Sequence, residues 1–193
     1  MSADIDIDFA DRTKILNLIK HTPARQLVDG QVRRHNTGVY VTDIPRDPIN
    51  QCAAIDYQTA DNLGYFKIDF LNMSVYQSIR DQAHYQKLLD TTPDWQKFNN
   101  DMEFFQKLVH VANHWGTLQT MPEPVDSIPR LAMFLAIIRP GKRHLAGKTW
   151  AEVAKTVWDQ TEEGYSFKKA HAVSYAVLVS VHMNIISESY EPK

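Results

Sequence analysis

The sequence has little of several features that would assign a protein class at once. It contains one cysteine, Cys52, in 193 residues, so no disulfide can form within the chain. A single cysteine is typical of a reducing compartment. The charge is nearly balanced, with 21 basic and 23 acidic residues and a calculated pI of about 6.4. A uniformly basic nucleic-acid coat is therefore excluded, and contacts with a polyanion would come from local patches.

Long apolar runs are also missing. The longest, LAMFLAII at residues 131–138, is much shorter than the roughly 20 residues that span a bilayer. The N-terminus is acidic and lacks the apolar run of a signal peptide. We therefore expect a cytoplasmic protein that does not contact a membrane. With 44% hydrophobic residues, 8 Phe, 8 Tyr and 4 Trp, the chain can form one folded domain with a core.

The stretch ADIDIDFADR, residues 3–12, alternates acidic and apolar side chains with the period of a β-strand. We expect the apolar set to face a core and the carboxylates to share the opposite face. Aspartate is a poor strand former and aligned like charges repel, so a divalent cation would stabilise this row. The alternative is a solvated acidic N-terminus that frays. The acidic set is Asp4, Asp6 and Asp8, and the apolar set is Ile5, Ile7 and Phe9.

Apolar spacing in the rest of the chain predicts more helices than strands. We expect helices over 13–20, 74–89, 94–114, 149–160 and 168–187, strands over 37–45, 52–58 and 63–73, and a buried helix or strand over 130–138. The 94–114 helix has an apolar stripe at three-four spacing and should end at Gly116. The sum predicts an α+β fold, in which a small mixed or antiparallel sheet packs with several helices. We expect one domain over 1–193, with its sheet in 1–90 and mainly helices in 91–193.

Two acidic stretches together resemble the palm of the bacterial replicative polymerase, the DNA polymerase III alpha subunit (C-family). DIDIDF at residues 4–9 resembles the family's D-F-D-V-D-F, and GYFKIDFLN at 64–72 resembles G-L-V-K-F-D-F-L-G. Asp6, Asp8 and Asp69 match the family's metal-binding aspartates, and Lys67 matches the lysine before the third of them.

Three further stretches follow in the family's order. RHNTGVYV at 34–41 is similar to H-A-G-G-V-V-I, LAMFLAIIRPG at 131–141 to A-L-V-A-L-F-R-P-G, and GYSFKKAHAVSYAVL at 164–178 to G-Y-G-F-N-K-S-H-S-A-A-Y-A-L. The residues kept are His35, Gly38, Arg139, Pro140, Gly141, Gly164, Tyr165, Phe167, Lys169, His171 and Tyr175.

The resemblance implies a nucleotidyltransferase that acts on primer-template DNA in replication or repair. Asp6, Asp8 and Asp69 would be both its catalytic and its metal-binding residues, holding two Mg²⁺ (or Mn²⁺) ions. The family's Gly-Ser-rich triphosphate segment has no counterpart here, so we expect a shortened palm with remnants of the fingers. A second polypeptide would complete the nucleotide site. Such trimming suits a phage-encoded protein working in a bacterial host's cytoplasm.

Two other functions stay open. One is a non-catalytic descendant of the palm that binds DNA or a replisome partner, or has a structural role. The other is a metal-dependent nuclease, in which water replaces the primer hydroxyl at the same carboxylates. Both would keep the acidic strands.

Basic residues near these stretches are candidate phosphate or DNA contacts. The alternative for each is an ordinary solvated charge, or for Lys67 an offset to the acids. Lys142, Arg143 and Lys148 lie in what we expect to be a glycine-containing loop, and Lys168, Lys169 and His171 begin the last helix, whose amides favour anions. The other candidates are His35, which adjoins Arg33 and Arg34, together with Lys67 and Arg139.

His110 and His114 are four residues apart, a spacing at which two histidines on one helix can share a metal. No third ligand or adjacent glutamate accompanies them. We therefore interpret them as ordinary histidines on a helix surface.

Overall fold

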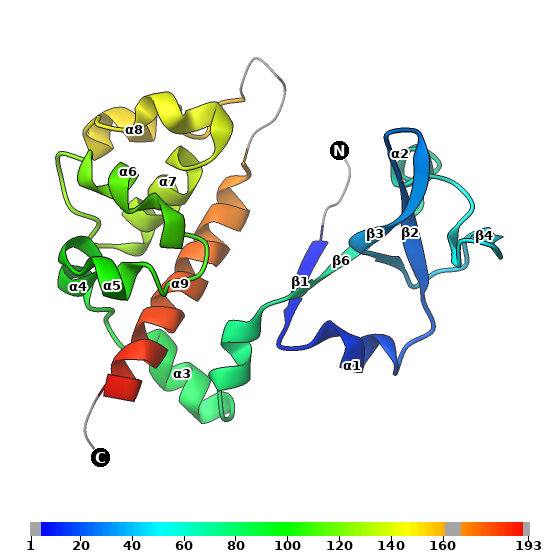
Figure 1. The fold of residues 1–193 in the computed structure, drawn as a ribbon, viewed down its shortest axis with the longest axis horizontal. Coiled ribbons are helices and arrows are strands. Elements are labelled where there is room, and N and C mark those ends of the chain that lie inside the picture. Colours follow the sequence, from blue (N-terminus) through cyan, green and yellow to red (C-terminus); the bar gives the residue numbers. More distant parts are fainter. Residues whose placement is uncertain (1–4, 161–166, 191–193) are drawn as a thin grey trace. The chain divides into compact units, whose positions relative to one another are not determined.

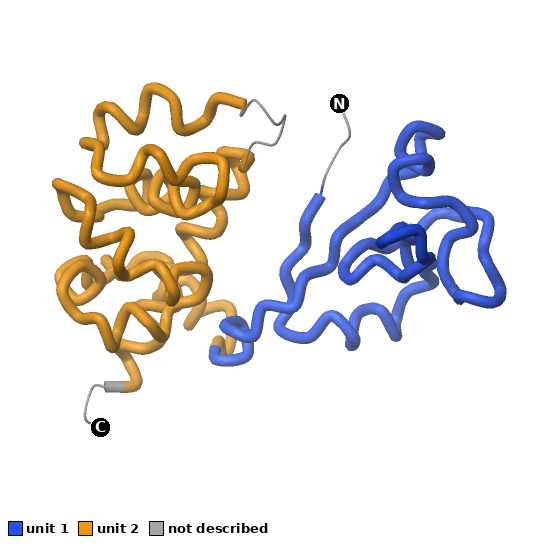
Figure 2. The backbone as a smooth tube through the Cα atoms, turned by 45° about the horizontal axis from the view of Figure 1, so that its top comes forward, with its two compact units in different colours: residues 1–78 blue, residues 79–193 orange. Residues whose placement is uncertain are grey.

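The computed structural model describes residues 5–160 and 167–190. Its internal contacts divide the chain into two compact units, Met1–Ser78 and Ile79–Lys193, which we call the sheet unit and the helical unit (Figure 2). The described chain is 49% helical and 18% strand, so the predicted α+β class is confirmed. From the sequence, we expected the boundary between the sheet-containing part and the mainly helical part to lie at residues 90 and 91. The expectation of a single domain stays a prediction. Asp4, Gly164 and Tyr165 lie outside the described residues.

The sheet unit is built on four strands in the order β1-β6-β3-β2 (Figure 1). β1 runs parallel to β6, and the other neighbours are antiparallel. A separate two-stranded sheet joins β4 to β5. The elements are β1 (Ile5–Phe9), α1 (Arg12–Leu16), β2 (Thr22–Val28), β3 (Gln31–Tyr40), β4 (Arg46–Asp47), β5 (Cys52–Ala53), α2 (Tyr57–Asn62), β6 (Ile68–Asn72) and the 3-10 helix η1 (Ser74–Ser78).

The hairpin of β2 and β3 was missed in the sequence, where only a strand over 37–45 was expected. Its turn is Asp29-Gly30, and both residues have positive φ, 52° and 74°. Positive φ at both central residues is the geometry of a type I′ turn, for which Asp-Gly is a favoured pair. The Asp-Gly pair was therefore a readable hairpin signal.

The expected orientation of β1 is wrong for two of its three apolar residues. Ile5 and Ile7 are 45% and 37% exposed, and only Phe9 packs inward, with its ring centroid 5.2 Å from that of Phe70. β1 is at the end of the sheet, and the buried cluster of the unit lies elsewhere, around Ala24, Tyr40, Ile44, Ala53 and Ala60. Alternation correctly indicated a strand but could not indicate an edge position.

The helical unit is organised around α7 and α9, which pack together in its core (Figure 1). α9 presents one row of fully buried residues, Ala172, Ala176, Val179 and Met183, at helical spacing. By length and composition α9 could also cross a membrane, so the cytoplasmic location stays a prediction. The elements are α3 (Gln82–Asp90), α4 (Trp95–Asn100), α5 (Met102–Phe105), η2 (Ala112–His114), α6 (Trp115–Gln119), α7 (Ile128–Ile137), η3 (Pro140–Leu145), α8 (Trp150–Thr156) and α9 (Lys169–Tyr190).

The continuous helix expected over 94–114 does not form. Asp101, at φ −110° and ψ 99°, ends α4 and begins α5, and its carboxylate accepts a hydrogen bond from the Phe104 N–H. Gly116 lies inside α6 rather than after a helix end. Phe98 and Phe105 are nevertheless fully buried, so the apolar stripe correctly identified core residues. The aspartate cap therefore ends one helix and begins the next, although the apolar stripe continues through both.

Other boundaries follow the same logic. The helix expected over 74–89 is divided, because Asp81 caps α3 by accepting from the His84 N–H. The predicted capping box is present, with Thr149 and Glu152 each accepting from the other's backbone N–H, but α8 ends at Thr156. Residues 130–138 lie largely in helix α7.

The buried hydroxyl of Tyr40 is expected to reduce the stability of the fold, and this can be tested. It is 1% exposed, and within the described residues its hydroxyl is buried without a hydrogen-bond partner. Burial, with Asp61 and Asp56 nearby, raises the pKa of Tyr40 to about 12.

We expect Tyr40→Phe to leave the free energy of unfolding unchanged or raise it by about 1 kcal/mol, because the variant removes an unpaired polar group and keeps the ring. Urea denaturation measures this, with Tyr40→Ala as the control that should lose roughly 3 kcal/mol of core packing. A Phe variant less stable than the parent would show that the hydroxyl has a partner.

Candidate functional site

The pairing of β1 with β6 places the three candidate metal ligands on one face of the sheet. Asp6 is the register partner of Asp69, and Asp8 pairs with Leu71 two residues further along. Register partners share a face, and side chains alternate between faces along a strand. Asp6, Asp8 and Asp69 therefore project to the same side from adjacent strands.

Asp69 lies at the centre of a compact polar cluster. The residue is 7% exposed, and its Oδ1 accepts a 2.7 Å hydrogen bond from the Thr37 hydroxyl. Its Oδ2 accepts from the Lys67 ammonium, so both carboxylate oxygens are engaged. Burial acts to raise the pKa of Asp69, but the hydrogen bonds from Lys67 and Thr37 and the lysine charge outweigh it and lower the pKa. Asp69 is therefore a stable carboxylate with its own cation.

His35 supports the cluster as a neutral imidazole. Its Nδ1 accepts from the backbone N–H of Gly38 at 2.9 Å, so the ring proton is on Nε2. Burial and the nearby Lys67 lower the pKa of His35, although Asp69 acts to raise it. The 3.6 Å approach of His35 Nδ1 to Asp69 Oδ1 is accordingly not an ion pair at neutral pH.

Gly38 gives Lys67 the room to reach Asp69. A Cβ at position 38 would lie 2.7 Å from Lys67 Cδ, closer than real Cβ atoms approach, and 3.0 Å from His35 Nδ1, which is tighter than most real Cβ contacts. Gly38 is also the register partner of Asp69 across β3 and β6. Four residues of the family-like stretches therefore lie together in one cluster: His35, Gly38, Lys67 and Asp69.

Asp6 and Asp8 are half-buried on β1. Burial raises the pKa of Asp8, the Asp6 charge raises it further, and a hydrogen bond with Tyr76 lowers it. The two carboxylates are thus close enough to repel each other, which is the condition that a bound cation relieves.

The donor chemistry fits Mg²⁺, because all three side chains offer the hard oxygen ligands that this ion prefers. Their grouping is less complete. Within residues 5–160 and 167–190, no three His, Cys, Asp or Glu side chains lie close enough to hold a metal ion together. The Lys67 ammonium bonds to Asp69 Oδ2, one of the oxygens that a metal ion would need as a ligand.

The basic residues predicted to contact phosphate or DNA in the helical unit differ in how exposed they are to solvent. Arg143, Lys148, Lys168 and Lys169 are exposed, whereas Lys142 is 7% exposed and its ammonium donates to the Thr156 carbonyl at 2.9 Å. Lys142 therefore ties η3 to the end of α8. The expected loop around it is wrong, since Pro140–Leu145 form a 3-10 helix.

Arg139 is half-buried, with its guanidinium 4.8 Å from the centroid of the Phe167 ring. Phe167 in turn stacks on Tyr175, whose ring lies 6.3 Å from that of His171. Two of the family-like stretches therefore meet within the helical unit.

His110 and His114 are not the helix-surface pair that we expected. His110 has a φ of 66°, its ring stacks on Tyr175 at 4.5 Å, and its Nε2 is buried without a hydrogen-bond partner in the described chain. Burial and then Arg139 lower its pKa to about 4. His114 lies in η2, and its pKa is lowered by burial, Arg143 and Arg139. No pattern in the sequence indicated this environment.

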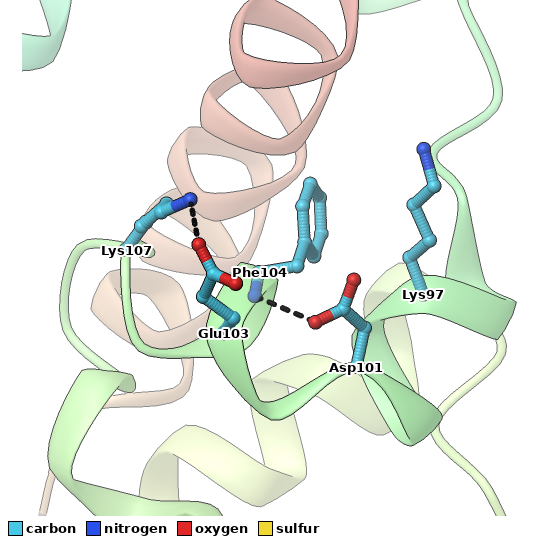
Figure 3. Close-up of a pocket in the computed structure, with 5 residues that line it drawn as sticks. All are labelled: Lys97, Asp101, Glu103, Phe104 and Lys107. Atoms are coloured by element: carbon cyan, nitrogen blue, oxygen red, sulfur yellow. Dashed lines mark hydrogen bonds and ion pairs between the residues drawn. The ribbon is translucent and has the colours of Figure 1, made fainter. Parts of the chain in front are cut away.

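Two pockets in the helical unit contain none of the residues that the sequence singled out as candidates for function. The one in Figure 3 has a volume of about 220 Å³, and Glu103 pairs there with Lys107 at 3.0 Å while Asp101 caps α5. The other, of about 390 Å³, lies between the end of α3 and α9 and includes the ion pair of Lys87 with Glu188. Their charges are largely used within the fold.

Comparisons of the chain with protein-family models, curated proteins and solved structures found no match. The resemblance to the polymerase palm therefore rests on the residues named above and on their placement.

We expect Lys67→Met to raise the pKa of Asp69, because the variant removes the hydrogen bond and the positive charge that lower this pKa and leaves the effect of burial, which raises it. A carboxyl with a lowered pKa stabilises the fold above its ordinary value of 3.8 and loses that contribution as the pH falls further. The variant should lack this contribution, and ¹³C NMR titration of the Asp69 carboxyl measures the change. Lys20→Met, at an exposed ion pair with Asp43, is the control. An identical Asp69 titration in both variants would contradict the assignment.

His110 should make stability depend on pH between its unfolded value of 6.5 and about 4. Because its pKa is lowered on folding, the unfolded chain binds the proton more tightly, and stability falls as the pH decreases through this window. We expect His110→Asn, which tolerates positive φ, to remove that component from urea denaturation curves. His144→Asn, at an exposed position, should retain it. A parent and an H110N variant with parallel pH profiles would contradict the prediction.

Proposed function

We propose that this chain is a palm-like nucleotidyltransferase module, similar to the DNA polymerase III alpha family, that acts on primer-template DNA in replication or repair. The single observation that supports it best is the in-register parallel pairing of Asp6 with Asp69, which sets three carboxylates on one face of two adjacent strands. Two-metal phosphoryl transfer needs carboxylates presented together in this way.

Asp6, Asp8 and Asp69 are the residues that would hold Mg²⁺ or Mn²⁺. Bound there, such ions would lower the pKa of a primer 3′-hydroxyl and stabilise charge on the transferred phosphoryl group. Lys67, which is bonded to Asp69 Oδ2, would have to give up that contact for a metal ion to bind there, and its ammonium would then be available to a phosphate. Thr37 keeps Asp69 oriented through its hydroxyl, and His35 accepts hydrogen bonds from the backbone N–H groups of Thr37 and Gly38 on the same strand.

We propose in addition that a second polypeptide contributes to the nucleotide site of this module. Arg139, Arg143, Lys148, Lys168 and Lys169, with His171, are the proposed phosphate contacts of the helical unit. Of these, Arg139 is favoured, because its guanidinium lies against Phe167, which stacks on Tyr175, where two of the family-like stretches meet.

A second candidate is a non-catalytic DNA-binding or replisome-interaction protein. The Lys67–Asp69 pair favours it specifically, since this pair satisfies the buried carboxylate without any metal. In that case the three carboxylates have a structural role only and bind no metal ion.

Metal-dependent stabilisation tests the proposal. We expect Mg²⁺ or Mn²⁺ to raise the free energy of unfolding, by about 2.7 kcal/mol at 100 times its Kd, because the ion binds only the folded chain. Asp6→Asn and Asp69→Asn should abolish this increment, and Asp43→Asn, at a side chain that is 92% exposed, should retain it. Thermal and urea unfolding with and without metal measure it.

Activity assays then separate the functions. Labelled nucleotide added to a primer supports the transferase, and metal-dependent loss of labelled DNA identifies a nuclease. DNA binding with no metal increment supports the non-catalytic candidate. A chain whose stability is the same with and without metal, in parent and variants alike, would refute the metal site.

A further inference from the structure

The two ends of the four-stranded sheet differ in how they are protected. β2, at one end, contains Pro23 and Arg25, its pairing with β3 shifts register between them, and Arg25 forms an isolated bridge with Asp56. Proline, a basic side chain and an irregular register are the devices that keep an edge strand from pairing with other chains.

β1, at the other end, has no proline, no basic side chain and no shift in register, and its charged residues are Asp6 and Asp8. Its register with β6 is continuous from Ile5 to Phe9, and no other described strand pairs with it. Ile5 and Ile7 are 45% and 37% exposed on one face, beside Phe70, which is 4% exposed. A regular edge with exposed β-branched residues is suited to accept another strand.

The charges on the opposite face of β1 determine which kind of strand could pair with its outer edge. Asp6 and Asp8 share that face, so a second copy of β1 would set aspartates against aspartates, which is destabilising. A strand with basic residues at alternate positions would pair with both carboxylates, and its apolar residues would cover Ile5 and Ile7.

We infer that the outer edge of β1 is a docking site for an extended segment of a partner protein in which apolar residues alternate with lysine or arginine. Recognition combines backbone pairing along β1 with two cross-strand ion pairs. This inference does not require the carboxylates to bind a metal, and it is tested without one.

The test uses the full chain in metal-free buffer and two labelled peptides, Val-Lys-Val-Lys-Val-Lys-Val and its matched glutamate version. We expect the lysine peptide to bind about tenfold more tightly in fluorescence anisotropy, from the sum of two cross-strand charge pairs. Amide hydrogen exchange should slow at alternate residues of 5–9 when the lysine peptide is added.

The charge-reversed variant Asp6→Lys/Asp8→Lys should reverse the preference to the glutamate peptide. Asp43→Lys/Asp61→Lys, which changes the same net charge at exposed positions of the sheet unit, should keep the parent's preference. Equal binding of both peptides, or slowed exchange outside β1 only, would overturn the inference. If the reversed variant does not fold, the parent's peptide preference and exchange pattern decide the question. Peptide binding is independent of the metal increment, so this inference and the proposed function can fail separately.

Discussion

The parallel, in-register pairing of β1 with β6 is the constraint on which the chemistry of the sheet unit depends. Side chains alternate along both strands, so a slip of one residue would turn Asp6 away from Asp69 and place an isoleucine beside it. With the register as it is, one face of the strand pair carries acids and the other carries Ile5, Ile7 and Phe70. The candidate metal site and the proposed docking edge are therefore two consequences of one pairing.

The Lys67–Asp69 contact decides how that acidic face can be used. A buried carboxylate needs a charge partner and hydrogen bonds, and Lys67 with Thr37 provides them. Gly38 is part of this arrangement, because a side chain there would collide with Lys67. A metal ion at Asp69 would have to replace the lysine, so the proposed metal and Lys67 would be alternative charge partners of this carboxylate. The catalytic and the non-catalytic proposals differ in which partner is functional.

The helical unit follows a different principle, in which apolar packing is dense and polar groups are fitted into it. α7 and α9 each supply more buried core residues than any other described element, and capping aspartates set where α3, α4 and α5 begin. His110 shows the cost of this arrangement, since a strained backbone and a buried ring nitrogen persist where its ring stacks on Tyr175. Burial first, and then the charge of Arg139, lowers the pKa of His110, and burial, Arg143 and Arg139 lower the pKa of the nearby His114.

Local patterns in the sequence determined the α+β class, the strand character of DIDIDF, the capping box at Thr149 and the core positions Phe98 and Phe105. These follow from side-chain period and capping chemistry, which act over a few residues. Only the tertiary structure decided that β1 is an edge strand, that Lys142 and the Nε2 atom of His110 are buried, and that Asp69 holds Lys67. Exposure and charge pairing arise between segments far apart in the chain, as Thr37 and Asp69 are, so no local pattern contains them.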